Sequence, residues 1–221
     1  MTPAGYPRIP HLRWSRGADP GDLILSEKAL AECSGRVFTY EEKLDGFNVA
    51  FLRNERGGFT PQARSGRTQG DRGGQLGRVR AWAAAHLGSL DTCMEDSSVL
   101  YGEWLLRRHT IEYDRLPDWL VVLDLWSPNR GFATVDVRAE RCRVAELVPA
   151  PVLGIGPWQT EAQLEAWCRR SRYSTGPAEG IILRDPARPE AGPIAKWLAP
   201  GFRRRTDEEW GDDQNSLAES A

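Results

Sequence analysis

The sequence predicts an α+β fold in which antiparallel sheets are flanked by helices. Several short segments are rich in β-branched and aromatic residues or alternate apolar with polar side chains, which is the pattern of strands. The connections near residues 44 and 54 are short enough to be hairpins, and hairpins join antiparallel strands. A parallel α/β sheet would also alternate strands with helices, but it needs longer connections.

The first half of the chain is expected to hold a hairpin-rich sheet and two helices. Residues 1–20 are rich in Pro and Gly and are expected to wrap the surface before a short helix at about 22–33. Asp45-Gly46 and residues 54–58 are the predicted turns. Strands are predicted at 36–40, 47–52 and 59–63, and a helix after a glycine-rich loop has the apolar face Val79, Trp82, Ala83, His86 and Leu87.

The second half of the chain is predicted to alternate strands with helices. Residues 98–106 and 119–126 are apolar runs typical of strands, and each run contains an acid, Glu103 or Asp124, that needs a partner if it is buried. A capping box at residues 160–163 opens a helix expected to reach about residue 170. The other predicted elements are a helix at 136–148 and strands at 179–184 and 193–198.

Length and composition predict one compact domain over residues 1–205. Residues 206–221 are rich in Asp and Glu, and we expect them to form an acidic tail that is at least partly disordered. The four cysteines show no CxxC spacing and the three histidines are scattered, which argues for reduced thiols and against a zinc site. No signal peptide and no apolar run of membrane-spanning length is present, so a soluble cytoplasmic protein is expected.

The basic residues are almost all arginines. Only three of the 29 basic residues are lysines, namely Lys28, Lys43 and Lys196. An arginine can make a surface contact or bind a phosphate, but only a lysine can supply a neutral amine as a nucleophile. An alternative is that a GC-rich genome leaves few lysine codons, so that the three positions have no special meaning. Lys28, in a polar helix, fits that alternative, whereas Lys43 and Lys196 lie in motif-like segments.

The net charge of −2 gives no global basic field that would indicate a nucleic-acid partner. The arginines nevertheless cluster, so a local basic groove stays open as an interpretation. The clusters are Arg64 with Arg67, and the arginines within 72–80, 107–108, 169–172 and 203–205.

Six motifs follow one another in a fixed order: a lysine turn, an arginine after the next hairpin, a Gly-Glu strand, an apolar strand, a Glu-Gly strand and a late lysine strand. This ordered set, over about residues 36–202, resembles the covalent nucleotidyltransferases, which comprise ATP-dependent polynucleotide ligases and mRNA capping enzymes. Lys43-Leu44-Asp45-Gly46 matches their KxDG motif. Asn48 and the segment 100–117 are most similar to RNA ligases of the phage RNA ligase 2 type.

The resemblance implies a role for each matching residue. Lys43 would be the nucleophile, Lys196 would hold the α-phosphate, and Glu179 would bind the metal or steer the lysine. Glu103 would hold the ribose hydroxyls, and Arg64 would contact the ribose-phosphate or the nucleic-acid end. Ile182 would pack on the adenine, and the nucleotide-binding set is completed by Glu42, Asn48 and Leu123.

The chain departs from the family pattern at two positions. Leu123 stands before Asp124 where a base-stacking aromatic residue is expected, and Leu198 stands where many relatives carry a second lysine. Arginines at 203–205 could replace that second cation. Taken singly, the motif residues also have ordinary interpretations: Glu103 and Glu179 as strand-end acids paired with arginines, Arg64 as a solvated hairpin end, and Leu123 and Ile182 as core residues.

The resemblance implies an ATP- and Mg²⁺-dependent RNA ligase, consisting of the nucleotidyltransferase domain only. It would seal 5′-phosphate and 3′-OH ends of RNA, as in RNA repair, through a lysyl-AMP intermediate and an adenylylated polynucleotide. No membrane is implied, and a protein partner could supply a missing C-terminal domain. Two alternatives stay open: a DNA-nick ligase that works with a partner, against which Asn48 speaks, and a nucleotide- or nucleic-acid-binding module that has lost turnover.

Overall fold

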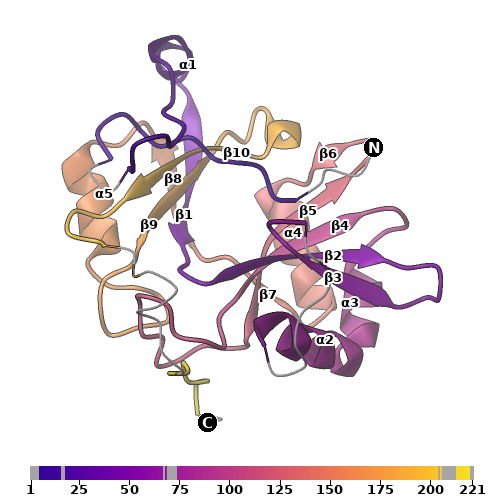
Figure 1. Cartoon of the computed structure of the whole chain (residues 1–221). Coiled ribbons are helices and arrows are strands. Elements are labelled where there is room, and N and C mark those ends of the chain that lie inside the picture. Colours follow the sequence, from indigo (N-terminus) through magenta and orange to yellow (C-terminus); the bar gives the residue numbers. More distant parts are fainter. Residues whose placement is uncertain are drawn as a thin grey trace.

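Two sheets, each with its own helices, make up the computed structural model of the protein (Figure 1). The structure describes residues 5–15, 18–66, 68, 74–203, 205 and 213–219. The first sheet has the strand order β10-β9-β1-β8, and the second has the order β3-β2-β4-β5-β6, with β7 paired to β5. All strand pairs are antiparallel except β5 with β7, and this arrangement confirms the predicted α+β class.

The first sheet has one apolar face and one polar face. It consists of β1 (Val37–Lys43), β8 (Val152–Pro157), β9 (Gly180–Arg184) and β10 (Pro193–Leu198). Phe38, Tyr40, Ile181, Leu183 and Trp197 are buried in a core that also contains Leu164 and Cys168 of α5 (Glu161–Cys168). Successive strand residues point to opposite faces, so the residues between them face away from α5. The capping box predicted at Thr160 opens this helix.

The second sheet is covered by the other long helices. Its strands are β2 (Phe47–Arg53), β3 (Phe59–Ala63), β4 (Val99–Trp104), β5 (Leu120–Ser127), β6 (Gly131–Phe132) and β7 (Val148–Pro149). Val49, Phe51, Leu100 and Leu120 share a core with Val79 and Trp82 of α2. The helices are α2 (Gln75–Ala85), α3 (Leu87–Cys93) and α4 (Val135–Val144), and the short elements are α1 (Glu27–Ala31) and the 3₁₀ turn Pro189–Ala191.

The prediction of a hairpin near residue 44 is wrong. β1 pairs with β8 and β9 in the first sheet, whereas β2 pairs with β3 and β4 in the second, so Leu44, Asp45 and Gly46 carry the chain from one sheet to the other. The Asp45 carboxylate accepts hydrogen bonds from the backbone N–H groups of Thr110 and Ile111. These contacts tie the connection to the segment after β4 instead of closing a turn. The hairpin near residue 54, between β2 and β3, is confirmed.

Other boundaries also differ from the prediction. The first helix is limited to Glu27–Ala31, the helix predicted at 136–148 ends at Val144, and β8 was not predicted. Residues 1–20 were expected to wrap the surface, but His11 and Leu12 are buried and pair with β10. His86 stacks on Trp82, and Leu87 is exposed instead of lying on an apolar helix face.

The segment 213–219 lies against the loop that follows β4. Gln214 and Leu217 form bridges with Arg107 and Leu116, and the Asn215 side chain donates to the carbonyl of Leu105. Residues 206–212 lie outside the described residues, so the predicted division of the chain at residue 205 stays a prediction. None of the helices that the structure describes is both long enough and apolar enough to cross a membrane.

Candidate active site

A cleft of about 690 Å³ lies between the polar face of the first sheet and inner strands of the second. Strands β1, β9 and β10 line it from one side, and β2, β4 and β5 line it from the other. Sequence reasoning placed nine residues in a nucleotide site, and all nine line this cleft. They are Glu42, Lys43, Asn48, Arg64, Glu103, Leu123, Glu179, Ile182 and Lys196.

Lys43 is the last residue of β1, and its side chain reaches the cleft with an exposed fraction of 16%. Its Nζ atom lies 2.6 Å from Oε2 of Glu179, which is buried at the start of β9. In the register of the sheet Lys43 lies opposite Gly180. A Cβ atom at Gly180 would lie 2.0 Å from the carbonyl oxygen of Trp197, so only glycine allows β10 to pack this closely beside the lysine.

Lys196 extends the same polar face from β10. Across the sheet it lies opposite Ile182 of β9, and Ile182 lies opposite Glu41 of β1, so these three side chains form one row. Burial lowers the pKa of Lys196, and the neighbouring cations Lys43 and Arg64 lower it further. The carboxylates of Asp22 and Glu179 act in the opposite direction. The face therefore presents two lysine amines beside one buried carboxylate.

Glu103 faces the cleft from β4 of the second sheet. Its Oε1 accepts the N–H of Gly46 at 3.0 Å, and its Oε2 accepts from the Asn48 side chain at 3.4 Å. Asn48 is its partner in the register of β2 and β4. Burial raises the pKa of Glu103, and the charge of Lys43 partly offsets this effect. The carboxylate is thus fixed at the wall of the cleft, close to the connection that carries Lys43.

The Glu42 carboxylate has its partners on the other side of β1. It accepts hydrogen bonds from the hydroxyl of Ser171 and, at 2.8 Å, from the backbone N–H of Arg172. Adjacent residues in a strand point to opposite faces, so this carboxylate points away from Lys43. Burial raises the pKa of Glu42. Within β1, therefore, Glu41 and Lys43 present side chains to the cleft, and Glu42 anchors the strand from behind.

The family model described as RNA ligase matches residues 36–198, which is most of the chain. The chain belongs to the RNA ligase family. The matched range contains Lys43, Glu103, Glu179 and Lys196, and thus both sides of the cleft. The closer resemblance to phage RNA ligase 2 stays a prediction. No curated protein sequence matches the chain.

Solved structures of ATP-dependent ligases share the fold of this member of the RNA ligase family. An archaeal ATP-dependent RNA ligase superimposes with a TM-score of 0.57 at 18% identity, covering 88% of this chain and 48% of its own. A putative ATP-dependent DNA ligase from Aquifex aeolicus gives 0.57 at 20% identity, covering 88% and 50%. A Naegleria gruberi RNA ligase mutant with ATP and Mn gives 0.60 at 14% identity, covering 90% and 62%. The chain spans about half to three fifths of the length of these structures.

The cleft also contains residues that sequence reasoning missed. His11, Asp22, His109 and Phe202 line it, and Arg203, one of the arginines proposed to replace the second lysine, does so too. Leu198 is buried at the edge of the cleft. Three other arginines from the predicted basic clusters, Arg67, Arg72 and Arg204, lie outside the described residues.

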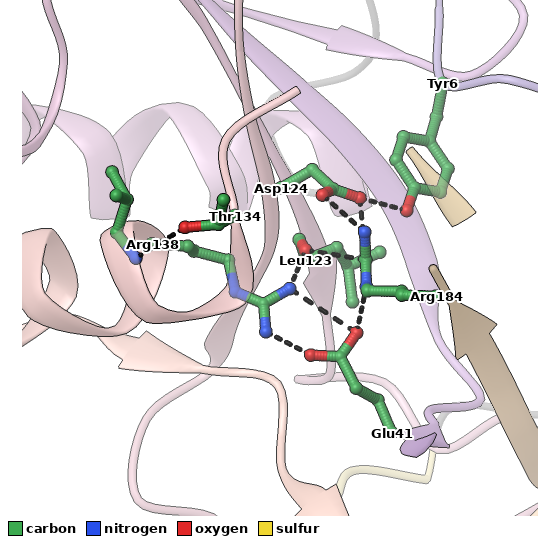
Figure 2. A network of polar contacts seen from close by, with 8 residues as sticks. Tyr6, Glu41, Leu123, Asp124, Thr134, Arg138 and Arg184 are labelled. Atoms are coloured by element: carbon green, nitrogen blue, oxygen red, sulfur yellow. Dashed lines mark hydrogen bonds and ion pairs between the residues drawn. The ribbon is translucent and has the colours of Figure 1, made fainter. Parts of the chain in front are cut away.

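At the wall of the cleft, a buried ionic network joins the two sheets of the RNA ligase fold (Figure 2). Arg184 of β9 contacts both oxygens of Asp124 on β5 at 2.8 Å and also bonds to Glu41 of β1. Arg138 of α4 is a second partner of Glu41, and both arginines donate to the carbonyl of Leu123. Tyr6 donates its hydroxyl to Asp124.

The four ionic side chains of the network are all buried, and each has an oppositely charged partner. Burial alone would raise the pKa of Glu41, but Arg184 and Arg138 hold that pKa below its usual range. Asp124 was recognised as an acid needing a partner, whereas the partner itself could not be read from the sequence. Because Glu41 lies in the same row as Lys196 and two residues before Lys43, the network also fixes the strand that carries the lysine.

The residues of the cleft fit a magnesium ion only if substrate phosphates and waters supply most of its ligands. Within the part of the chain that the structure describes, no group of three or more His, Cys, Asp or Glu side chains could hold a metal ion by itself. Mg²⁺ usually keeps several waters and binds through one or two carboxylates together with substrate phosphates. The buried carboxylate of Glu179, beside Lys43, fits that incomplete protein contribution.

Proposed function

We propose that this chain is the nucleotidyltransferase part of an ATP-dependent RNA ligase that joins 5′-phosphate and 3′-OH ends. The observation that carries the proposal is the meeting of two lysine amines and two buried carboxylates, from both sheets, in one cleft. The family of the chain supports ligase chemistry, and the motif order supports ATP as the nucleotide donor. Cytoplasmic location and a role in RNA repair belong to the same proposal.

In the first step the neutral amine of Lys43 attacks the α-phosphorus of ATP. A nitrogen–phosphorus bond forms, the bond from the α-phosphorus to the bridging oxygen breaks, and pyrophosphate leaves with the electron pair. The nitrogen loses one of its two protons to solvent or to a neighbouring base, which gives lysyl-AMP. Reactions of this type depend mainly on positioning and on charge neutralisation, because the protein forms few other bonds.

The side chains around Lys43 have distinct tasks in that step. Lys196 carries positive charge to the α-phosphate, and Glu103, fixed by Gly46 and Asn48, accepts hydrogen bonds from the ribose hydroxyls. Arg64 contacts the ribose-phosphate or the nucleic-acid end, and Leu123 with Ile182 provides an aliphatic slot for the base. Glu179 would share in holding Mg²⁺, which when bound neutralises phosphate charge.

The carboxylate of Glu179 has a second task before the nucleotide arrives. At 2.6 Å it pairs with the amine of Lys43 and so holds that side chain in the cleft. An amine that is engaged by a carboxylate is not available to attack phosphorus, so Glu179 must exchange this partner before the attack. Glu179 is also the residue that would hold a metal ion, so its carboxylate has a second partner available in the cleft.

Two further steps complete the proposed reaction. An oxygen of the RNA 5′-phosphate attacks the α-phosphorus of lysyl-AMP, which breaks the nitrogen–phosphorus bond and gives the adenylylated polynucleotide. The 3′-hydroxyl of the other end then attacks the 5′-phosphate, forms the phosphodiester and releases AMP. A protein partner that takes part in these later steps belongs to the same proposal.

ATP is expected to label the protein at least about tenfold better than GTP. Leu123 and Ile182 offer the base an aliphatic slot, and the chain belongs to a ligase family, so both observations favour the ATP site of a ligase over the GTP site of a capping enzyme. The measurement is covalent labelling by α-labelled ATP or GTP in the presence of Mg²⁺, followed on denaturing gels at matched concentrations. Labelling by GTP that equals or exceeds labelling by ATP would instead favour an mRNA capping activity.

A nicked duplex with ribonucleotides on the 3′-OH side is expected to be sealed at least about tenfold faster than an all-DNA nick. A ribose terminus differs from deoxyribose by its 2′-hydroxyl and its A-form geometry, and polar side chains beside the nucleophile can recognise both. Binding should weaken steeply with salt, because Arg64 and Arg203 in the cleft contact phosphates. A ligation series in which only the 3′-OH nucleotides change from ribo to deoxyribo measures the preference.

The possible outcomes of that series separate the alternatives. Equal sealing of the two nicks would contradict the RNA assignment and favour a DNA-nick ligase; a putative ATP-dependent DNA ligase from Aquifex aeolicus shares the fold. Covalent labelling without any sealing would indicate that a partner supplies the missing half of the reaction.

A further inference from the structure

An N-terminal segment places a buried histidine beside Lys196. Residues 10–12 run along the outer edge of β10, where the N–H of Lys196 donates to the carbonyl of Pro10 and the N–H of Leu12 donates to the carbonyl of Lys196, both at 2.8 Å. His11 and Lys196 are bridge partners, so their side chains lie next to each other on the polar face of the sheet. The His11 side chain is 1% exposed and lines the cleft.

Each nitrogen of the His11 ring has one polar neighbour. Nε2 lies 3.0 Å from Oδ2 of Asp22, and Nδ1 lies 3.3 Å from the hydroxyl of Ser15. A carboxylate oxygen can only accept, so the neutral tautomer with its hydrogen on Nε2 is the one that suits both neighbours. The Ser15 hydroxyl in turn accepts the N–H of Leu198 at 3.0 Å. A series of polar contacts thus connects β10 to Asp22 through Ser15 and His11.

The Asp22 carboxylate is held by its contact with His11 and by the backbone of its own loop. Its Oδ2 also accepts the backbone N–H of Asp19 at 3.1 Å, and the side chain is 29% exposed at the rim of the cleft. Burial would raise the pKa of Asp22, but the Asp19 hydrogen bond, Lys196 and His11 together lower it. Asp22 is therefore an anion at neutral pH, and none of the nucleotide-site roles described above uses it.

The charges around Lys196 explain why a carboxylate at Asp22 is useful. Burial and the cations Lys43 and Arg64 lower the pKa of Lys196, whereas the carboxylates of Asp22 and Glu179 raise it. Glu179 is engaged by Lys43 at 2.6 Å. Burial, Lys196 and Lys43 lower the pKa of His11, so the imidazole adds no positive charge that would compete with Lys196.

We propose that His11 and Asp22 are positioning residues for Lys196: the imidazole, which lies beside Lys196 on the sheet and 3.0 Å from the Asp22 carboxylate, holds that carboxylate at the rim of the cleft, and the carboxylate directs the Lys196 side chain into it. Neither side chain needs to touch the nucleotide for this task. The inference deepens the proposed function, because the ammonium group of Lys196 is what would meet the α-phosphate. It assigns a function to the segment before residue 36, where the match to the RNA ligase family begins.

The scarcity of lysine makes a direct test possible, because the protein contains only three. In protein labelled with ¹³C-lysine, the Cε signal of Lys196 is identified by its loss in Lys196→Arg and followed as a function of pH. The Asp22→Asn variant should shift the Lys196 titration to lower pH. Asp19→Asn removes the same charge three residues away and leaves the Asp19 backbone N–H in place, so its titration should match that of wild type. A Lys196 titration that is the same in Asp22→Asn and wild type would overturn the proposal.

A kinetic experiment tests the consequence for the reaction. The rate of covalent labelling by ATP in Asp22→Asn, divided by the rate in wild type at the same pH, should fall as pH rises, because Lys196 loses its proton at lower pH in the variant. We expect a loss on the order of tenfold relative to wild type at pH 9 and a loss of less than about twofold at pH 7.5. The loss should appear in the apparent KM for ATP. A pH profile of Asp22→Asn that coincides with those of wild type and Asp19→Asn would contradict the proposal.

Variants of His11 separate positioning from simple packing. His11→Gln keeps an N–H donor toward Asp22 and should retain most of the wild-type pH profile, whereas His11→Ala should behave like Asp22→Asn. If either His11 variant does not fold, the Asp22→Asn titration still decides, since Asp22 is partly exposed. The lysine titration requires no catalysis. A wild-type protein that takes up no label would therefore count against the proposed function alone.

Discussion

Lys43→Ala and Lys43→Arg variants are expected to take up no covalent label from α-labelled ATP in the presence of Mg²⁺, a loss of at least about a thousandfold. Lys43 is the amine that contacts Glu179 at 2.6 Å, on the same face as Lys196 and at the end of the strand fixed by the ionic network. Alanine removes the nucleophile, and arginine keeps a positive charge but cannot give up a proton. The measurement is a denaturing gel followed by peptide mapping of the labelled residue.

Lys28→Arg provides the matched control. Lys28 is an exposed residue of α1, so this variant should be labelled like wild type. Label retained in the Lys43 variants, or mapped to Lys28 or Lys196, would contradict the assignment of the nucleophile. A wild-type protein that binds ATP without taking up label would instead support the alternative of a binding module that has lost turnover.

The strands that carry the cleft could be predicted because their pattern is local. Residues 179–184 and 193–198 alternate as half-buried strands do, and the structure has β9 and β10 at almost these positions. The capping box at Thr160 and the hairpin at residues 54–58 also depend only on residues a few positions apart. The convergence of Lys43, Glu103 and Lys196 on one cleft followed from the order of motifs, since spacing alone does not give distances.

The connection between β1 and β2 could not be predicted from local pattern. Asp45-Gly46 has the composition of a hairpin turn, but the strands on either side find better partners in two different sheets. The deciding contacts are those of the Asp45 carboxylate with residues 110 and 111, more than sixty positions away. β8 was missed for a related reason. Gly154 looks like a strand breaker, but Trp167 of α5 packs over it and would lie 3.0 Å from a Cβ there.

Two sets of polar contacts at the site also could not be predicted from the sequence. The network of Glu41, Asp124, Arg138 and Arg184 joins residues that are up to 143 positions apart, and no spacing rule connects them. The contact of His11 with Asp22 was hidden because residues 1–20 looked like a surface wrap. Such contacts depend on which strands become neighbours, and that is decided by the packing of the whole chain.

Arg184→Met is expected to destabilise the protein by about 3–5 kcal/mol, because it leaves two buried carboxylates with fewer partners. Arg184 is the group that bonds both to Asp124, through two contacts at 2.8 Å, and to Glu41. Asp124 would keep only the hydroxyl of Tyr6 among its partners in the network, and Glu41 would keep Arg138. Urea unfolding of wild type and variant, followed by tryptophan fluorescence, measures the difference in free energy.

The stabilisation of wild type should also depend on pH in a defined direction. Although burial opposes it, Arg184 and Arg138 lower the pKa of Glu41 in the folded protein. A carboxyl whose pKa is lowered by folding contributes stability above its unfolded pKa, about 4.3, and this contribution is lost as pH falls through the folded value. The free energy of unfolding of wild type should therefore decrease below about pH 4 through this group, and the difference from Arg184→Met should narrow there.

The exposed pair of Glu140 and Arg143 on α4 supplies the control, since Arg143→Met removes an arginine from an ion pair of similar length at 2.7 Å. Exposed ion pairs contribute little to stability, so this variant should unfold almost like wild type. If Arg184→Met is as stable as Arg143→Met, the network does not hold the two sheets together. If Arg184→Met is destabilised but folded, its labelling by ATP should also be slower, because Glu41 lies in the strand that positions Lys43.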